Sequence, residues 1–236
     1  MTASADSIPR HDMYLLVHKG LRAFLNHTLD RVGRIDANDR AEVEEVLAGF
    51  RALCYGLRSH VHHEDHFVHA AMEARQPGSA ATKRAEHVHH LAAIDRLQTL
   101  AGAVAQAAQV ADTVACARAA ATLYAQLGLF VAENLTHMHE EETANNAVLW
   151  ANYTDAELLQ IEASLVASIP PVAMGAFLRW TLPAITAAER ASFVAGVAHT
   201  APREVLEGVL AVARAHLSPR DWYKLQHAIG PLPLAA

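Results

Sequence analysis

The sequence is poor in cysteine and in clustered positive charge. Two cysteines, Cys54 and Cys116, are too few for a disulfide framework, and they do not form the CxxC spacing of a zinc or redox site. The formal net charge is −6 and no basic run occurs, which argues against nucleic acid or anionic lipid as a partner. We therefore expect a cytoplasmic protein that does not bind nucleic acid.

Long apolar runs are also missing. No stretch of about 18 apolar residues occurs, the length that a membrane span requires. The N-terminal segment lacks a basic stretch followed by an unbroken apolar one, so we expect no secretory leader. These two absences predict a soluble protein with no membrane partner.

Aromatic residues are scarce as well, at 6% of the 236 residues, whereas apolar residues reach 52% and Ala and Leu are abundant. This composition favours packed helices over strands. The length is sufficient for a large buried core. We predict an all-α fold.

Turn and capping signals divide the first part of the chain into four long helical segments. The connections are short, which predicts antiparallel neighbours in an up-down four-helix bundle over residues 1–152. Asp39 and Asp112 are the expected caps of the second and fourth segments. The expected segments run from about Pro9 to Val32, from Asp39 to the QPG at 76–78, from Ala81 to Gln109 and from Asp112 to Trp150.

Residues 153–236 are predicted to form an additional C-terminal helical unit. Thr154 with Glu157 and Thr186 with Glu189 have the spacing of capping boxes. The prolines of IPP (169–171) and LSPRDW (217–222) break and restart helices. The rest of this unit has an ordinary amphipathic helical pattern.

Histidine is distributed unevenly along the chain: of 16 histidines, 13 precede Glu140. Because residues four apart share a helix face, His60 and Glu64 are expected within the apolar stripe of the second segment, formed by Val46, Phe50, Leu53, Leu57, Phe67 and Ala71. His137 and Glu141 repeat the same H-x-x-x-E spacing within the stripe of the fourth segment, formed by Leu123, Leu127, Phe130, Ala144 and Val148. The chain therefore contains two copies of one inward-facing pair.

Other histidines are expected on both faces of their helices. His18 lies at the centre of the first stripe, and His87 and His90 point inward from the third segment. A row on the second segment is expected to face outward, as a solvated face or, alternatively, as a weak surface metal site or an oligomer contact such as a homodimer interface. This row comprises His62, His66 and His69.

Two buried carboxylates in apolar stripes require compensating positive charge, because their unpaired burial costs several kcal/mol. Lys83 and Arg22 are the only basic residues near the facing positions. Metal ions are therefore the favoured partner, and the number of inward donors exceeds what one ion needs. A dinuclear site follows as a hypothesis, and a donor set without thiolate suits iron, and less specifically zinc, copper or manganese.

These motifs resemble the hemerythrin-like (HHE) family over roughly residues 10–150. The resemblance is carried by His18, His60 with Glu64, the EH of Glu86 and His87, and His137 with Glu141. It implies a four-helix bundle around a non-haem di-iron centre, in which the two glutamates bridge the ions and the histidines are terminal ligands.

The chain departs from the oxygen-carrying hemerythrins at two positions. Lys83 stands four residues before His87, where the carriers have a histidine, and the last motif ends at Glu141 where they have a longer gap to an aspartate. Both departures are similar to the family branch of bacterial iron-sulfur-repair and nitric-oxide-responsive proteins and of a eukaryotic iron-sensing domain. They argue against reversible oxygen carriage.

Four further residues are candidates for the site. His90 is either a ligand that replaces the missing histidine or a group that hydrogen-bonds a ligand. His11 is expected near the end of the bundle or behind a ligand. Tyr14 and Asn134 are packing residues, or they orient a ligand or gate small molecules.

The leading hypothesis is a protein with two iron ions that binds or reacts with O2, NO or a peroxide in sensing, stress protection or iron handling. Zinc or manganese is the less favoured metal. The first alternative is a di-iron oxygenase or peroxidase that acts on an organic substrate. The second is a scaffold with a structural or adventitious zinc site.

Overall fold

A computed structural model describes residues 10–230 of the chain, and every regular element in that range is helical. The all-α prediction is confirmed. Pro9, the expected start of the first helix, lies outside the described residues, but residues 10–14 are not helical, so the first helix starts later than predicted. The first helix, α1, begins at Leu15. Just before it, the Asp12 carboxylate accepts hydrogen bonds from the backbone N–H groups of Tyr14 and Leu15.

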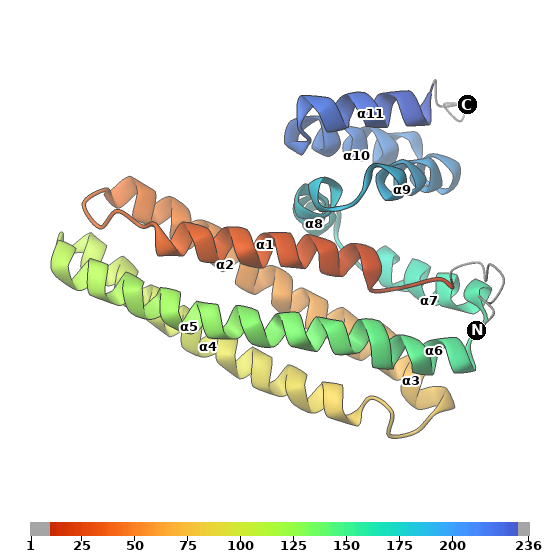
Figure 1. Cartoon of the computed structure of the whole chain (residues 1–236), viewed down its shortest axis with the longest axis horizontal. Coiled ribbons are helices and arrows are strands. Elements are labelled where there is room, and N and C mark those ends of the chain that lie inside the picture. Colours follow the sequence, from red (N-terminus) through yellow and green to blue (C-terminus); the bar gives the residue numbers. More distant parts are fainter. Residues whose placement is uncertain (1–9, 231–236) are drawn as a thin grey trace, which may run out of the picture.

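Long helical rods pack side by side and run in alternating directions (Figure 1). Contacts between α1 and α2, α2 and α4, α4 and α5, and α5 and α1 close the rods into a ring. Two of the rods contain one turn of π-helix, η1 or η2, between two α-helical parts. The elements are α1 (Leu15–Gly33), α2 (Arg40–His63) with η1 (Glu64–Val68) and α3 (His69–Arg75), α4 (Ala81–Gln109), and α5 (Thr113–Glu140) with η2 (Glu141–Asn145) and α6 (Asn146–Asn152).

Side-chain caps fix the starts of two rods where the sequence predicts them. The Asp39 carboxylate accepts a hydrogen bond from the Glu42 backbone N–H at 3.1 Å. Asp112 accepts one from the backbone N–H of Ala115 at 2.9 Å. The turn before α4 passes through Gly78 at φ +87°, a conformation in which a side chain would be strained.

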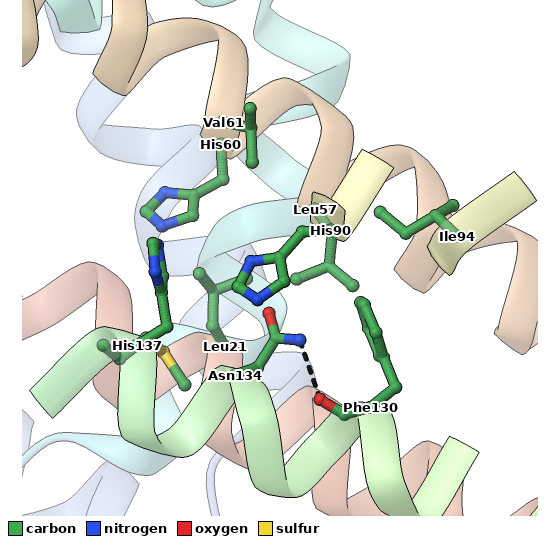
Figure 2. Close-up of a pocket in the computed structure, with 10 residues that line it drawn as sticks. Leu21, Leu57, His60, Val61, His90, Ile94, Phe130, Asn134 and His137 are labelled. Atoms are coloured by element: carbon green, nitrogen blue, oxygen red, sulfur yellow. Dashed lines mark hydrogen bonds between the residues drawn. The ribbon is translucent and has the colours of Figure 1, made fainter. Parts of the chain in front are cut away.

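The bundle interior contains two apolar clusters. The larger one fills the part of the bundle next to the α1–α2 and α4–α5 connections and includes Leu25, Phe50 and Leu127. The smaller one lies near α7 and is formed by Tyr14, Val68, Met72, Ala80, Leu149 and Leu158. A small cavity borders the larger cluster, where Leu21, Leu57, Ile94 and Phe130 meet several polar side chains (Figure 2).

The two π-turns change which residues face the core. A π-turn adds one residue to a helical turn, so every later residue is rotated by about 100° relative to an uninterrupted α-helix. The predicted stripes are wrong beyond the turns for this reason: Phe67, Ala71 and Val148 are only partly buried and Ala144 is exposed. The residues one position later, Val68, Met72, Asn145 and Leu149, are buried instead.

Up to residue 230, the last one described, the C-terminal unit consists of five helices. Both predicted capping boxes are present, at Thr154 with Glu157 and at Thr186 with Glu189. Helices α8 to α11 share their own apolar cluster and lie on the outer side of α1 (Figure 1). The helices are α7 (Asp155–Ala167), α8 (Pro171–Ala184), α9 (Ala187–Thr200), α10 (Arg203–His216) and α11 (Pro219–Ile229).

Two contacts place this unit against the bundle. Helix α8 approaches α1 closely at Gly20, and the Trp180 ring stacks on Phe24 with 4.3 Å between ring centroids. Helix α7 returns to the end of the bundle, where Arg75 binds Glu157 at 2.5 Å. The expected boundary between residues 152 and 153 falls between α6 and α7, and the division into two domains stays a prediction.

The continuous helix Thr113–Asn152 is long and apolar enough, by length and composition alone, to cross a membrane. A second span would require α7 and α8 together, which are bent by 117°. In the bundle, Thr113–Asn152 packs against α4 and α1, and it carries the polar residues described next. Bundle packing buries 33% of its most apolar stretch.

Candidate metal centre

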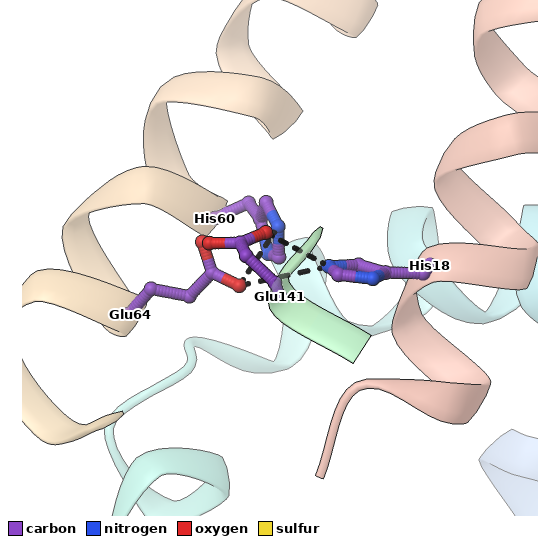
Figure 3. Close-up of side chains that lie close together, drawn as sticks. All are labelled: His18, His60, Glu64 and Glu141. Carbon is purple, nitrogen blue, oxygen red and sulfur yellow. Dashed lines mark ion pairs between the residues drawn. The ribbon is translucent and has the colours of Figure 1, made fainter. Parts of the chain in front are cut away.

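Two histidines and two glutamates from three rods meet in the interior of the bundle (Figure 3). One ligand atom from each lies within 4.8 Å of the others. His18 Nε2 is 3.6 Å from Glu64 Oε1 and 3.6 Å from Glu141 Oε2, and His60 Nε2 is 3.2 Å from Glu64 Oε1. We call this the first donor group.

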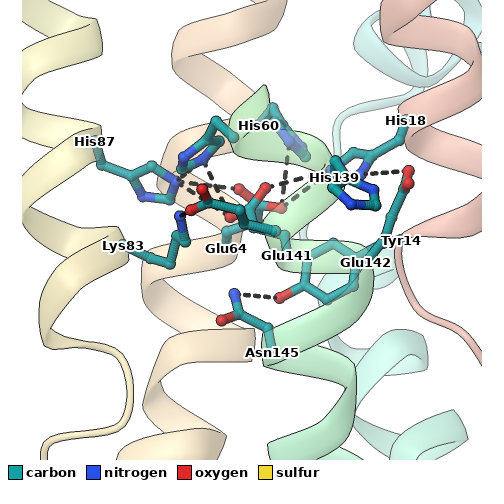
Figure 4. A network of polar contacts seen from close by, with 12 residues as sticks. Tyr14, His18, His60, Glu64, Lys83, His87, His139, Glu141, Glu142 and Asn145 are labelled. Carbon is teal, nitrogen blue, oxygen red and sulfur yellow. Dashed lines mark hydrogen bonds and ion pairs between the residues drawn. The ribbon is translucent and has the colours of Figure 1, made fainter. Parts of the chain in front are cut away.

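The second donor group contains the same glutamates with His87 and His137. His87 Nε2 is 3.4 Å from Glu64 Oε2 and 3.6 Å from Glu141 Oε1, while His137 Nε2 is 3.2 Å from Glu141 Oε1. Each glutamate thus directs one oxygen to the first group and its other oxygen to the second (Figure 4). This is the arrangement that two bridging carboxylates require.

Six polar atoms at the centre lack a hydrogen-bond partner within the chain, whereas the Nε2 atoms of His87 and His137 form a hydrogen bond of 3.1 Å with each other. Both carboxylate oxygens of Glu64 and of Glu141, and the Nε2 atoms of His18 and His60, are buried without a hydrogen bond. Glu64 is 3% exposed and Glu141 0%. An uncompensated buried carboxylate costs several kcal/mol, so these converging lone pairs fit a pair of cations.

Three of the histidines are oriented through their other ring nitrogen. When such a ring is neutral, its Nδ1–H donates to a carboxylate and its Nε2 lone pair is directed at the centre. Such outer hydrogen bonds fix the ring tautomer and its rotation. The pairs are His18 with Glu142 at 3.0 Å, His87 with Asp65 at 2.9 Å and His137 with Glu86 at 2.7 Å.

Two basic residues neutralise these outer carboxylates. Arg22 donates two hydrogen bonds to Glu142, at 2.6 and 3.0 Å. The buried Lys83 ammonium binds Glu86 at 2.7 Å and also contacts Glu140. Lys83 therefore compensates charge behind His137, and the centre itself receives no lysine or arginine from the described residues.

The pKa values of the central histidines and glutamates reflect the balance of charge among these side chains. Burial lowers the pKa of His18, but Glu142 and Glu64 raise it more strongly, to about 9. Burial also lowers the pKa of His87, but Glu141 and Glu64 outweigh this effect and raise it to about 10. Despite burial, the pKa of Glu64 lies well below its usual range because His60, His18 and His87 surround it. Protonated imidazoles thus balance the glutamates that cations would otherwise neutralise.

Two other histidines are neutral. Burial lowers the pKa of His60 to about 4, against the opposing effect of Glu64. Burial, with the nearby His137 and His87, lowers the pKa of His90 to about 4. A neutral imidazole retains the lone pair that a metal or a hydrogen-bond donor needs.

The remaining sequence candidates lie around the centre. His90 belongs to neither donor group; its ring packs edge-on against His137 at 4.6 Å and lines the cavity of Figure 2. Asn134 lines the same cavity and donates to the Phe130 carbonyl at 2.8 Å.

The Tyr14 hydroxyl accepts from Asn145 at 3.1 Å, with its ring 5.1 Å from that of His18. His11 is farther out and pairs with Glu162 at 3.1 Å.

Two orienting carboxylates and the burial of one histidine were not predicted from the sequence. Asp65 and Glu142 directly follow the two central glutamates, so an acidic residue after each H-x-x-x-E motif was a usable signal. The prediction that His69 faces outward is wrong: its side chain is 0% exposed, because the π-turn rotates it inward. His62 and His66 of the same row are exposed as expected.

The cavity beside the centre has a volume of about 10 Å³. It lies between the donor groups and the larger apolar cluster, and His60 and His137 are part of its wall (Figure 2). A space of about this size holds one water-sized molecule. The centre therefore borders a small, mostly apolar chamber.

Comparison with known proteins gives one family. The family model described as the hemerythrin HHE cation binding domain matches residues 11–146, which contain all members of both donor groups. The comparisons with curated proteins and with solved structures gave no match.

Proposed function

Because the chain belongs to the hemerythrin HHE cation-binding family, we propose that it is a di-iron protein whose metal pair binds or reacts with O2, NO or a peroxide. The observation that carries this proposal is the division of the carboxylate oxygens. Glu64 and Glu141 each offer one oxygen to each donor group. A single-ion site would leave two of these buried oxygens without a partner.

The donor set favours iron among the available metals. It consists of imidazole nitrogens and carboxylate oxygens without a thiolate, which suits Fe(II) and also accommodates Zn(II) or Mn(II). His18 and His60 would hold one ion, and His87 and His137 the other. Bound iron would supply redox chemistry and coordination positions that the protein leaves open.

The chain's own residues prepare the site for a small ligand. The carboxylates of Glu142, Asp65 and Glu86 fix three imidazole rings, so little reorganisation accompanies binding. The apolar clusters on both sides exclude bulk water from the centre. These features support a protein that admits a small molecule to a dry, preorganised site.

The cavity size favours a diatomic or peroxide ligand over an organic substrate. A pocket for an organic substrate typically measures several hundred Å³, whereas this cavity measures about 10 Å³. A larger hollow, lined by charged residues such as Arg31 and Glu45, lies roughly 20 Å along α1 from His18 by helix rise. We therefore propose sensing, stress protection or iron handling as the role, ahead of oxygenation of an organic substrate.

Metal analysis tests the di-iron proposal. Protein purified from iron-replete cells should contain two iron ions per chain. Glu64→Ala and Glu141→Ala should each lose both ions, because each carboxylate serves both positions. Glu133→Ala, which removes an exposed carboxylate of α5, is the matched control and should retain both. Zinc without iron in the wild-type protein, or loss of a single ion in the glutamate variants, would contradict the proposal.

Ligand binding is tested on the same preparation. Anaerobic Fe(II)-loaded protein is exposed to O2, NO or hydrogen peroxide, and the optical and Mössbauer spectra are recorded. Spectral change with at least one of these molecules is expected. Unchanged spectra with all three, or oxygen consumption that depends on an added organic substrate, would contradict the proposed class of ligand.

A further inference from the structure

We propose that His69 is a further metal ligand, the third histidine of the ion that His87 and His137 hold. This inference rests on the proposed function and adds a donor that the sequence motifs do not assign. His69 is fully buried, and its Nε2 has no hydrogen-bond partner. The lone pair of a buried imidazole nitrogen needs a hydrogen-bond donor or a metal ion as its partner.

The π-turn η1 brings His69 to this position. In an uninterrupted α-helix, the residue five positions after Glu64 would point away from the glutamate by about 140°. The additional residue of the π-turn places His69 in the interior, next to Val68 and Met72. π-Turns within α-helices occur frequently at functional sites.

Asp65 orients His69 together with His87. Its Oδ1 atom accepts hydrogen bonds from the Nδ1 atoms of both rings, each at 2.9 Å. The two rings stack with 5.0 Å between centroids and 23° between planes. The two rings are nearly parallel, and Asp65 Oδ1 binds both of them at Nδ1, so their Nε2 atoms face the same side. For His87 this is the side of Glu64 and Glu141.

The charge environment of His69 agrees with this orientation. Burial lowers the pKa of His69, and the negative charges of Glu64 and Glu141 oppose this shift. Asp65, His69 and His87 also form a group whose donor atoms lie within 4.8 Å of one another. His87 thus belongs both to this group and to the second donor group, of which His69 is not a member.

His90, the other candidate for a third histidine, has weaker support. Like His69 it belongs to neither donor group, but unlike His69 it shares no carboxylate with His87; its ring packs edge-on against His137 and lines the cavity. On the other rod, Asn146 occupies the position five residues after Glu141, equivalent to His69 after Glu64. The two ions would therefore have three and two histidines, and the ion at His18 and His60 would have fewer protein donors.

Paramagnetic NMR of the Co(II)-loaded full chain tests the assignment without reference to activity. A Co(II)-bound imidazole with a protected Nδ1–H gives one strongly shifted, exchangeable proton resonance. His69→Gln should remove one such resonance and weaken binding of one of the two ions at least about tenfold. His66→Gln, an exposed histidine of the same π-turn, is the matched control and should retain all resonances and both affinities.

A second measurement uses the unaltered protein, so it does not depend on folding of the variant. Histidine ring-nitrogen NMR during Zn(II) titration should move the Nε2 resonance of His69 into the metal-bound range, together with those of His87 and His137. Loss of a shifted proton in His90→Gln but not in His69→Gln, or an unmoved His69 Nε2 in zinc-loaded protein, would overturn the inference and leave the di-iron proposal standing. Failure of the wild-type protein to bind any metal would overturn both.

Discussion

At the scale of the residue, the carboxylates behind the histidines determine how the centre is built. Glu142, Asp65 and Glu86 each receive an N–H from an imidazole whose other nitrogen faces the central glutamates. Arg22 and Lys83 in turn neutralise Glu142 and Glu86. The positive charges are therefore placed one layer outside the centre, where they stabilise the orienting groups and leave the central oxygens available to cations.

Glu157 provides a pH-dependent contribution to stability. Arg75 and the Thr154 cap lower the pKa of Glu157 from its ordinary 4.5 to about 2. A depressed folded-state pKa stabilises the folded protein above pH 4.5, and this stabilisation is lost as the pH falls from 4.5 toward 2. Glu157→Gln should therefore lower the urea midpoint at pH 7, and the difference from the wild type should shrink below pH 4.5.

The control for this prediction is Glu133→Gln, an exposed carboxylate with only a distant partner, His89 at 3.9 Å. It should leave the midpoint unchanged over the same pH range. An offset between Glu157→Gln and the wild type that is constant down to pH 2 would show that the ionised carboxylate is not responsible for the stabilisation.

Helical periodicity places the central residues on one face of each rod because none of them lies beyond the first residue of a π-turn. His60, Glu64, His137 and Glu141 have the regular four-residue spacing, and the structure brings them together with His18 and His87. His69 could not be placed in this way. Its burial depends on one additional residue in a turn, and no residue type in EDHFV signals that insertion.

At the scale of the element, the same insertion explains the misplaced apolar stripes. Helical periodicity predicts Phe67 and Ala144 as core residues, but Val68 and Asn145 are buried instead. Both shifts begin at a central glutamate, because η1 starts at Glu64 and η2 at Glu141. Burial in the second half of these two rods therefore could not be predicted from a 3.6-residue period, whereas the caps at Asp39 and Asp112 could.

Close packing between α1 and α8 gives a prediction at a glycine. A Cβ at Gly20 would lie 2.3 Å from Thr181 Oγ1 and 3.1 Å from Thr181 Cα, and that hydroxyl is held by the Phe177 carbonyl at 3.1 Å. Gly20→Ala should therefore destabilise the protein by about 1–3 kcal/mol through overpacking, as measured by urea unfolding.

Gly49→Ala is the matched control, because Gly49 lies within α2 and has nothing within 4 Å of the position of a Cβ. Alanine is a better helix former than glycine, so this variant should be more stable than the wild type by about 0.5–1 kcal/mol. A destabilisation of equal size in both variants would mean that the approach of α8 to α1 is not the cause.

At the scale of the whole molecule, the bundle and helices α8–α11 have separate apolar cores that meet along α1, while α7 adds Leu158 to the smaller cluster of the bundle. One face of α1 carries His18 into the metal centre, and another carries Gly20 and Phe24 against α8. The capping boxes and proline breaks predict the helices of the C-terminal unit. They do not predict that α8 lies on α1, because a docking partner depends on shape complementarity between faces that have the same apolar composition.

The stack of Trp180 on Phe24 allows the two units to be tested separately. The ring planes differ by 13°, and His27 lies 4.9 Å from the same indole. Trp180→Ala should cost about 2 kcal/mol, from the lost aromatic contact and partial burial. Since Trp180 has no contact with either donor group, the variant should retain the metal content of the wild type, and hydrogen exchange should increase in α8–α11 more than in α4 and α5.

The matched control is Tyr223→Ala, an exposed aromatic residue of α11 that stacks only on His227 of its own helix, with 3.8 Å between ring centroids. It should leave the exchange of α8 close to that of the wild type. If the bundle and the C-terminal unit form one cooperative structure, Trp180→Ala would instead raise exchange in α4 and α5 as much as in α8. That outcome would contradict the division at residues 152 and 153, because a destabilised docking surface can loosen only the helices that unfold together with it.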